Sequence, residues 1–365
     1  MITYVYPADL AGCGFYRLIL ASNVLIRAGH QVRIIPPKSR HGIAGTTDNA
    51  GNLVDVNVPP DADVMVFQRV TYNTIAGSFP MIRSRGVAVV VDMDDDLDRI
   101  DSRNPAFWAL HPSAGGKHTT MTAAQACAHA TMVTVSTPAL LKRYAPDGNG
   151  VVLPNYVPSE FFTVPRQDST VVGWGGSLHS HPGDLQVMGD AAARLMREGY
   201  QFRVVGPPED VRKALSLPWE PDTTWALPIN RWMLGLSTLG VGVAPLADTI
   251  FNQAKSRLKL LECAAAGVPT VFSPRADYSA LHAETDIGVP AAKPRDWYRE
   301  LKRLVEDHRY RADKSEADRA AAAQLTYEAH AWRWMQVWED ALKRQRAGSA
   351  LLRRTFHDSP QKAQV

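Results

Sequence analysis

The chain has 365 residues, of which 45% are hydrophobic and 21% are charged, and its formal net charge is +3. This composition is that of a globular protein and excludes a disordered or fibrous chain. The net charge is too small for this length to indicate a nucleic-acid-binding protein by itself. At this length two domains, each with its own core, are expected.

The cysteines and the amino-terminal sequence indicate the cellular compartment of the protein. Cys13, Cys127 and Cys263 lie far apart and form no CxxC spacing. We therefore expect a reduced, cytoplasmic protein without a structural zinc site. The chain reaches Pro7 without the basic start and long apolar core of a signal peptide, and no apolar run approaches the length of a membrane span. The sequence thus predicts neither export nor a transmembrane helix.

Short apolar runs alternate with helical periods along most of the chain. In the first half we predict strands over 3–6, 31–35, 63–68, 87–92 and 132–136, and helices near 15–28, 71–84, 120–129 and 138–144. In the second half we predict strands over 170–175, 202–206, 241–245 and 269–273, and helices near 184–197, 209–215, 230–238 and 255–266. This alternation predicts the α/β class with two Rossmann-like doubly wound domains, whose ligands bind outside the carboxyl ends of the strands.

Prolines mark the boundary between the two halves. The stretch 153–169 contains several prolines and no sustained periodicity, which is typical of a linker. We predict an N-terminal domain over 1–155, a linker over 156–169 and a second domain over 170–325.

The carboxyl-terminal part predicts a packing helix and a tail. One long helix is expected over about 315–345, with a buried stripe of Tyr327, Ala331, Trp334, Trp338 and Leu342. The segment 346–365 is expected to be a flexible basic tail. The basic residues near this end, which would contact an anionic surface or simply remain solvated, are Lys343, Arg344, Arg346, Arg353 and Arg354.

The loop after the first strand contains two glycines. Gly12 and Gly14 would let the backbone approach a ligand, and Arg17 lies on the first turn of the helix that follows. A helix N-terminus with a nearby cation favours an anion. The alternative is a tight strand-to-helix turn without a ligand.

An acidic run follows the strand over 87–92. It contains Asp92, Asp94, Asp95, Asp96 and Asp98. Such closely spaced carboxylates cost free energy unless they are protonated, paired or bound to a cation. A metal, a hydroxyl-rich ligand or an unusual base would each relieve them. The alternative is a helix N-terminus, where acids are favoured.

The stretch VVGWGGSLHSHPGDL, residues 171–185, again joins a strand to glycines and a helical segment. Gly175 and Gly176 would admit a phosphate. His179 and His181 stand on the same loop and are expected to contact a phosphate or a hydroxyl rather than a metal.

The stretch FNQAKSRLKLLECAAAGVPTVFS, residues 251–273, places Lys255, Arg257 and Lys259 where a predicted helix begins, although that end is already positive. Lys255, Lys259 and Glu262 would share one face of this helix. The face suits a nucleoside diphosphate, with phosphates on the lysines and the ribose on Glu262. The alternative is a solvated helix in which Glu262 pairs with Lys259. The opposite stripe, expected to pack inward, is Leu258, Leu261 and Ala265.

These motifs together resemble a family. PLADTIFNQAKSRLKLLECAAAGVPTVFSPRADY is similar to the donor-binding region of retaining GT-B glycosyltransferases of family four. VVLPNYVP resembles their interdomain segment, and the two glycine loops occur in the expected order over residues 1–285. The resemblance implies transfer of a sugar from a UDP- or GDP-type nucleotide sugar to an acceptor hydroxyl, with retention and no obligatory metal or other cofactor. It also implies two domains facing across a cleft and a helix over 326–345 that crosses back to the first domain.

The resemblance assigns roles to individual residues. Glu262 corresponds to the second glutamate of the family's E-x7-E motif, while the first would fall at Ala254 and is absent. Lys255 and Ser256 occupy the phosphate loop, and Lys255 and Lys259 would stabilise the leaving diphosphate. The loop that starts at Ser177 replaces the family's usual arginine and lysine.

The acidic run and the segment after it complete the expected site. Asp94, Asp95 and Asp96 would orient the reacting sugar or the acceptor, or balance positive charge at the anomeric carbon. The acceptor loop is expected over 102–118. It would hold a glycan, a protein side chain or a modified nucleobase through Trp108, His111 and His118.

Two other functions are open. VVVDMDDDL also resembles the first motif of haloacid-dehalogenase phosphatases, with Asp92 as nucleophile, Asp94 as acid/base and magnesium as Lewis acid. Asp96 departs from that motif, which has Thr or Val there. The other alternative is a non-catalytic nucleotide-sugar or glycan-binding protein that lost its activity with the glutamate at Ala254. The oligomeric state is left open.

Overall fold

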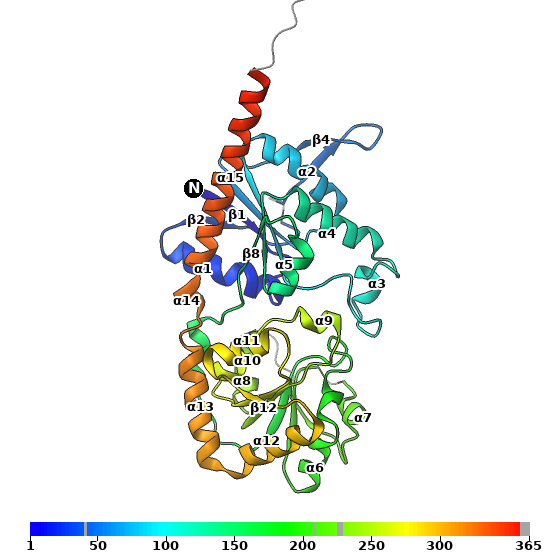
Figure 1. Ribbon diagram of the computed structural model, residues 1–365, viewed down its shortest axis with the longest axis vertical. Helices are drawn as coiled ribbons and strands as arrows, with labels where there is room; N and C mark the ends of the chain where they lie inside the picture. Colours follow the sequence, from blue (N-terminus) through cyan, green and yellow to red (C-terminus); the bar gives the residue numbers. More distant parts are fainter. Residues whose placement is uncertain (40–41, 208, 225–228, 358–365) are drawn as a thin grey trace, which may run out of the picture. The chain divides into compact units, whose positions relative to one another are not determined.

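The computed structural model describes residues 1–39, 42–207, 209–224 and 229–357 (Figure 1). The chain divides into two compact units. Unit 1 consists of Met1–Asp94, Lys117–Leu153 and Ala331–Val365, and unit 2 consists of Asp95–Gly116 and Pro154–His330. The first and the last segments of the described chain therefore both belong to unit 1.

A parallel sheet with the strand order β2-β1-β5-β6-β7-β8 forms the centre of unit 1. Its strands are β1 (Ile2–Tyr6), β2 (Gln31–Ile34), β5 (Val64–Gln68), β6 (Ala88–Met93), β7 (Met132–Val135) and β8 (Gly150–Val152). β5, β6 and β7 are buried along their whole length, which explains their nearly continuous apolar sequence. Asp92 is the charged residue of β6 and is fully buried, so it requires a partner inside the protein.

Helices and one hairpin complete unit 1. They are η1 (Phe15–Ile19), α1 (Leu20–Arg27), β3 (Gly45–Thr47), β4 (Leu53–Val56), α2 (Asn73–Ser84), α4 (Lys117–His129), α5 (Pro138–Tyr144) and α15 (Trp332–His357). α2 packs on α4, while α15 packs on α1, β5 and β6 (Figure 1). The indole rings of Trp334 and Trp338 are buried at the inner face of α15.

The sheet of unit 2 is also parallel and has the order β11-β10-β9-β12-β13-β14. Its strands are β9 (Val172–Gly175), β10 (Phe202–Val205), β11 (Asp222–Thr224), β12 (Val241–Ala244), β13 (Thr270–Phe272) and β14 (Val289–Pro290). The chain starts at β9, adds strands on one side and then returns to add β12 on the other side. In such a sheet the loops after the two central strands diverge, and ligands bind where they part.

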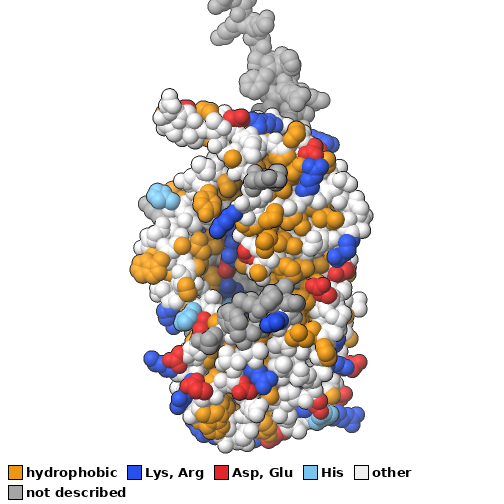
Figure 2. Space-filling model, turned by 180° about the vertical axis from the view of Figure 1, so that it is seen from behind, with side chains coloured by type: hydrophobic (Ala, Val, Ile, Leu, Met, Phe, Trp, Pro, Cys, Tyr) orange, Lys and Arg blue, Asp and Glu red, His pale blue; other side chains and the backbone are white. Residues whose placement is uncertain are grey.

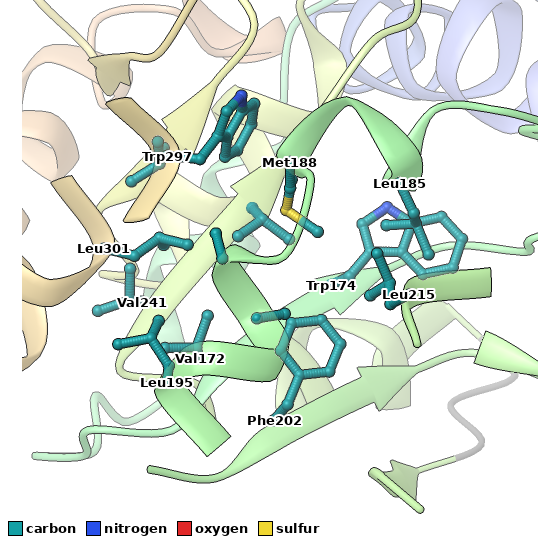
Figure 3. Close-up of a cluster of buried hydrophobic side chains, with 14 of the residues drawn as sticks. Val172, Trp174, Leu185, Met188, Leu195, Phe202, Leu215, Val241, Trp297 and Leu301 are labelled. Atoms are coloured by element: carbon teal, nitrogen blue, oxygen red, sulfur yellow. The ribbon is translucent and has the colours of Figure 1, made fainter. Parts of the chain in front are cut away.

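The helices of unit 2 surround this sheet. They are α3 (Phe107–Leu110), η2 (Ser159–Thr163), η3 (Leu185–Met188), α6 (Ala191–Arg197), α7 (Val211–Leu215), α8 (Ile229–Leu236), α9 (Ile250–Gln253), α10 (Leu258–Ala265), α11 (Ala276–Thr285), α12 (Pro294–Glu306), α13 (His308–Ala322) and α14 (Tyr327–His330). Figure 3 shows part of the core between β9, β10, β12 and these helices, where Trp174, Leu185 and Trp297 are fully buried.

The predicted α/β class with two Rossmann-like units is confirmed, and each predicted strand is present to within a residue or two. Five strands were not predicted: β3, β4, β8, β11 and β14. Each has two to four residues, too few for a hydrophobic period to be visible.

The single helix predicted over 315–345 is wrong. α13 ends at Ala322, and the backbone at Leu325 and Tyr327 instead bonds to Val157, at N···O distances of 3.3 and 3.0 Å. This bridge takes the backbone groups that a continuous helix would need. The predicted stripe, Tyr327, Ala331, Trp334, Trp338 and Leu342, is nevertheless buried.

Two further expectations are corrected. Residues 95–116 were expected in the N-terminal domain but belong to unit 2, where Arg103 and Asn104 donate to the carbonyl oxygens of Pro182 (3.3 Å) and Ser180 (3.2 Å). The tail expected from residue 346 continues instead as α15 to His357. Residues 358–365 lie outside the described part of the chain.

The surface carries both signs of charge. Figure 2 shows basic and acidic side chains intermixed over one face, as the small net charge suggests. Among the helices of the described residues, none is both long and apolar enough to cross a membrane.

Candidate functional site

The loops after β9 and β12 are joined by one buried carboxylate. Asp184 is 2% exposed, and its Oδ1 accepts hydrogen bonds from the amide of Ala247 (2.8 Å) and from Nδ2 of Asn252 (2.6 Å). Its Oδ2 lies 3.2 Å from Nδ1 of His181. Asp184 therefore fixes both loops at the point where the strand order of unit 2 reverses.

His181 is held as a neutral ring at this position. Burial, followed by the charge of Lys259, lowers the pKa of His181 to about 4, although Asp184 acts in the opposite direction. The ring also makes an edge contact with Trp174. A neutral imidazole can accept or donate a hydrogen bond but adds no positive charge to the loop.

Lys259 lies against the glycine turn after β9. Its Nζ donates to the carbonyl oxygen of Gly175 at 2.6 Å and lies 5.0 Å from the centre of the Trp174 ring. A Cβ on Gly176 would approach that ring to 2.8 Å and Nζ of Lys259 to 3.1 Å, so the turn requires glycine. Burial lowers the pKa of Lys259. The predicted neighbours Gly175, Gly176 and Lys259 are thus brought together.

Lys255 and Ser256 precede α10 instead of lying on it. α10 begins at Leu258, so the expectation that Lys255 shares a helix face with Lys259 and Glu262 is wrong. The Nζ atom of Lys255 lies 3.2 Å from an oxygen of Asp95. Lys255 therefore stands in the turn between α9 and α10, already beside a carboxylate.

The cation at the start of α10 is also compensated internally. Arg257 is buried, and its Nη2 lies 2.7 Å from Asp277 while its Nη1 lies 2.8 Å from Glu284. Burial by itself lowers the pKa of Arg257, but the hydrogen bonds to these two carboxylates raise it by more. Arg257 is a structural residue that ties α10 to α11.

Glu262 is buried on α10. It is 6% exposed, and its Oε1 accepts a hydrogen bond from Nε1 of Trp232 on α8 at 3.0 Å. Trp232 and the neighbouring Leu236 also contact the backbone turn, because a Cβ on Gly175 would lie 3.0 and 2.8 Å from them. Trp232 could not be predicted from the sequence, since a tryptophan at a helical position usually indicates core.

The loop that follows Gly176 surrounds a carboxylate that the sequence did not predict. The Oε1 atom of Glu209 accepts from Oγ of Ser177 (2.8 Å) and lies 2.9 Å from Nδ1 of His179. The other carboxylate oxygen accepts from the amides of Leu178 and His179. Ser177 and His179, both predicted for this site, thus contact the same carboxylate, that of Glu209.

The glycine loop of unit 1 is closed on its own carboxylate. Oδ1 of Asp9 accepts from the amides of Ala11 (3.1 Å), Gly12 (2.6 Å) and Gly14 (3.3 Å). A Cβ on Gly14 would lie 2.0 Å from the carbonyl oxygen of Asp9. These glycines therefore match the alternative of a tight turn, in which Asp9 occupies the amides expected for a ligand.

Arg17 is corrected from an anion-binding residue to a structural one. It is fully buried, with Nη2 2.8 Å from Oδ1 of Asp92 and Nη1 2.5 Å from the carbonyl oxygen of Leu153. Asp92 also accepts from Oγ1 of Thr134 at 2.6 Å. Enclosed by these partners, Asp92 is not placed to act as the nucleophile of a phosphatase.

Asp94 is bound by a residue that the sequence analysis missed. Nε and Nη2 of Arg69 lie 2.5 and 2.9 Å from its two carboxylate oxygens. Burial acts to raise the pKa of Asp94, but the charge and hydrogen bonds of Arg69 lower it by more. Arg69 has a φ of 47°, an uncommon conformation for a residue other than glycine. The pair keeps Asp94 ionised.

The acidic run is divided between the units and is not the start of a helix. Asp94 ends the first segment of unit 1, whereas Asp95 and Asp96 belong to unit 2. Residues 94–98 adopt no helical conformation, which excludes the helix N-terminus as the explanation of the run.

The expected acceptor residues do not form one group. Trp108 is 72% exposed on α3, and the ring of His111 stacks on Phe107 in the same segment of unit 2. His118 is exposed on α4 of unit 1. Over the described residues, no cluster of three or more His, Cys, Asp or Glu side chains is arranged to hold a metal ion.

Known proteins resemble this chain in structure but not in sequence. Neither a family model nor a curated protein matches the sequence. Sucrose-phosphate synthase from Thermosynechococcus elongatus matches with a TM-score of 0.62 at 15% identity, over 93% of this chain and 99% of that one. Anabaena HepE in complex with UDP-glucose matches with a TM-score of 0.60 at 12% identity, over 94% and 99%. The chain has the GT-B fold.

TarM shares the GT-B fold with a TM-score of 0.54 at 12% identity, over 75% of this chain. The chain spans about half, 54%, of the TarM structure. In this GT-B chain, unit 2 corresponds to a classical Rossmann order with its loops tied by Asp184. The carboxylates Asp184 and Glu209 were missed because their partners are distant in sequence.

Proposed function

We propose that this protein is a glycosyltransferase that moves a sugar from a nucleoside-diphosphate sugar to an acceptor hydroxyl. The observation that carries the proposal is the position of Lys259, 2.6 Å from the Gly175 carbonyl at the strand reversal of unit 2, with Glu262 on the same helix. A glycine turn lets a phosphate approach the backbone, and a lysine supplies its counter-charge. Glu262 would accept hydrogen bonds from the ribose hydroxyls.

The structural neighbours support a nucleotide-sugar donor. HepE has been crystallised with UDP, with UDP and glucose, and with UDP-glucose. These ligands favour UDP over GDP as the first nucleotide to test. The identity of the transferred sugar, a hexose or a pentose, depends on the residues that contact it.

Ala254 stands where the family's first glutamate would contact the sugar, and Ala254 is 2% exposed.

Lys255 and Lys259 would carry the electrostatic part of the reaction. As the bond to the sugar breaks, negative charge develops on the diphosphate, and preorganised cations stabilise it. Lys255 would exchange Asp95 for a phosphate oxygen. Transfer with retention follows if the leaving phosphate takes the acceptor proton on the same face, which needs neither a protein base nor an obligatory metal.

The acidic residues would act on the sugar side. Asp95 and Asp96 of unit 2 are proposed to orient the sugar or the acceptor once Lys255 binds phosphate. Asp94 is held by Arg69 within unit 1, and the role at the anomeric carbon expected for it from the sequence stays a prediction. The exposed ring of Trp108, with His111 in the same segment of unit 2, is proposed for the acceptor, which is a glycan, a protein side chain or a modified nucleobase. The role predicted for His118 of unit 1 stays a prediction. Cys13, Cys127 and Cys263 form no disulfide, which supports a cytoplasmic enzyme.

Thermal stabilisation by nucleotides tests the proposal. Wild type, Lys255→Ala and Lys259→Ala would be heated with UDP, GDP, ADP and UDP-glucose, in EDTA and in magnesium. The matched control is Lys213→Ala, which removes an exposed lysine of α7 in the same unit. We expect a metal-independent rise in Tm with one nucleotide in wild type and in the control, and a smaller rise in the two site variants.

The outcomes separate the alternatives. No rise with any nucleotide in wild type would contradict a nucleotide-sugar site. Binding without release of nucleoside diphosphate from a nucleotide sugar, in the presence of candidate acceptors, would favour the non-catalytic binding protein. Stabilisation by magnesium alone, with phosphate release from a phosphate ester, would favour the phosphatase.

A further inference from the structure

Three hydrogen-bond donors and one histidine ring nitrogen of the same loop converge on Glu209. They are the hydroxyl of Ser177, the amides of Leu178 and His179, and Nδ1 of the His179 ring. The His179 amide lies 3.3 Å from the carboxylate and Oγ of Ser177 lies 2.8 Å from it. The Glu209 side chain is only 9% exposed, so these donors enclose its charge.

Glu209 reaches this loop from a different part of unit 2. It stands between β10 and α7, whereas the donors follow β9. Consecutive amides with a nearby hydroxyl form the kind of concavity that binds anions, phosphate among them. A carboxylate fills such a concavity with two oxygens, and a phosphate would fill it with three. The loop over residues 177–179 is therefore an anion-binding site whose occupant is the carboxylate of Glu209.

We propose that Glu209 occupies, in the ligand-free protein, the position that a phosphate group of the donor takes, and that the donor binds by displacing it. The inference rests on the proposed function, because it identifies the phosphate as part of a nucleotide sugar. Displacement makes Glu209 a determinant of affinity. A ligand must replace one full charge and several hydrogen bonds, which favours a diphosphate over a neutral sugar.

The competing explanation is that Glu209 only holds the loop in shape. The two explanations predict opposite signs for one substitution. Glu209→Gln keeps the length of the side chain and one acceptor oxygen but removes the charge. If Glu209 competes with the ligand, the substitution weakens that competition and ligands bind more tightly. If Glu209 only maintains the shape of the loop, the substitution weakens the loop and ligands bind less tightly.

Calorimetric titration of wild type and Glu209→Gln with pyrophosphate, UDP and UDP-glucose tests the proposal. We expect about a tenfold lower Kd for pyrophosphate and UDP in the variant, equivalent to about 1.4 kcal/mol. The matched control is Glu220→Gln, which removes an exposed glutamate that pairs with Arg212 on α7, and it should leave Kd unchanged.

A second measurement uses the wild-type protein and does not depend on the variant folding. Carboxyl groups would be labelled with a carbodiimide and an amine, and the labelled residues identified by mass spectrometry. Displacement predicts that saturating pyrophosphate raises the labelling of Glu209 several-fold, although bound ligands usually protect a site. The labelling of Glu220 should not change.

The results distinguish this inference from the proposed function. If UDP binds wild type but binds Glu209→Gln equally or less tightly, displacement is overturned and the nucleotide site stands. If no nucleotide binds either protein but pyrophosphate binds the variant more tightly, displacement of Glu209 by an anion is supported. The proposed glycosyltransferase function is then overturned. If no anion binds either protein, both are overturned.

Discussion

The charged residues that precede α10, and the carboxylate enclosed by the loop after β9, have partners inside the protein. Lys255 lies beside Asp95, Arg257 beside Asp277, and the loop of Ser177 and His179 encloses Glu209. A desolvated charge without a partner costs several kcal/mol, and each of these charges is stabilised by its internal partner. A diphosphate that binds as we propose would exchange with Asp95 and Glu209.

His181 gives a pH-dependent contribution to stability that can be isolated. Its pKa is lowered from 6.5 to about 4, chiefly by burial. Between these pH values the unfolded chain binds a proton that the folded protein does not. Stability rises with pH wherever the unfolded state binds more protons, so the contribution of His181 falls as pH falls through this window. The change in the free energy of unfolding between pH 6.5 and 4 is about 2 to 3 kcal/mol.

We therefore expect that His181→Asn loses less of its free energy of unfolding between pH 6.5 and 4 than wild type does. Asp318, whose pKa burial raises to about 6, acts with the opposite sign in both proteins, so the comparison cancels it. Urea unfolding at several pH values would measure the difference, with the exposed His30→Asn as control for the loss of one histidine. Parallel pH profiles for wild type and His181→Asn would contradict the prediction.

At the scale of elements, α10 depends on its link to α11. α10 starts with Arg257 at its N-cap, where the helix dipole disfavours a cation. Asp277 compensates for this by accepting from both the amide and the guanidinium of Arg257. The orientation of α10, and with it the positions of Lys259 and Glu262, is therefore set by a buried ion pair.

Removing one partner of this pair should be costly. We expect Asp277→Asn to lower the free energy of unfolding by about 3 to 5 kcal/mol, because it leaves Arg257 buried with reduced compensation. Glu284→Gln, which removes the 54% exposed second partner, should cost less than about 1 kcal/mol. Urea denaturation followed by circular dichroism would measure both. Equal effects would show that burial of the pair is not what stabilises α10.

At the scale of the whole molecule, unit 1 needs both ends of the chain. Trp334 and Trp338 of α15 are buried in unit 1, and Nε1 of Trp334 donates to the carbonyl oxygen of Arg17 at 3.0 Å. Unit 1 therefore cannot complete its core until residues more than three hundred positions apart meet. Unit 2 has a separate core around β9 and α12.

Trp338→Ala should destabilise unit 1 selectively. Truncating a buried tryptophan costs about 3 to 5 kcal/mol, because it removes apolar contact and leaves a cavity. We expect faster amide hydrogen exchange in β5 and β6 of unit 1, with exchange in β9 and β12 of unit 2 unchanged. The matched control is Trp332→Ala on the same helix, whose ring is 58% exposed. Equal acceleration in both units would show that the two cores do not unfold independently.

The sequence by itself determined the fold class and most of the elements, because buried parallel strands must be apolar and their helices must follow with a period of 3.6 residues. It also predicted a phosphate contact for Gly175 and Gly176 and another for Lys259, and the structure places these residues together. It could not determine which charges are satisfied internally. Whether Arg17 meets a ligand or Asp92 depends on contacts across 75 positions of the chain.

Those pairings became visible in the folded chain. Glu209 enters the loop of Ser177 from 32 positions away, and Val157 interrupts the predicted long helix by bonding to Leu325 and Tyr327. Local patterns report which face of a segment is apolar, and they carry no information about which distant polar group will approach it. The sequence therefore predicted candidate residues such as Lys255 and Ser177, while the folded chain showed that Asp95 lies beside Lys255 and that Glu209 accepts from Ser177.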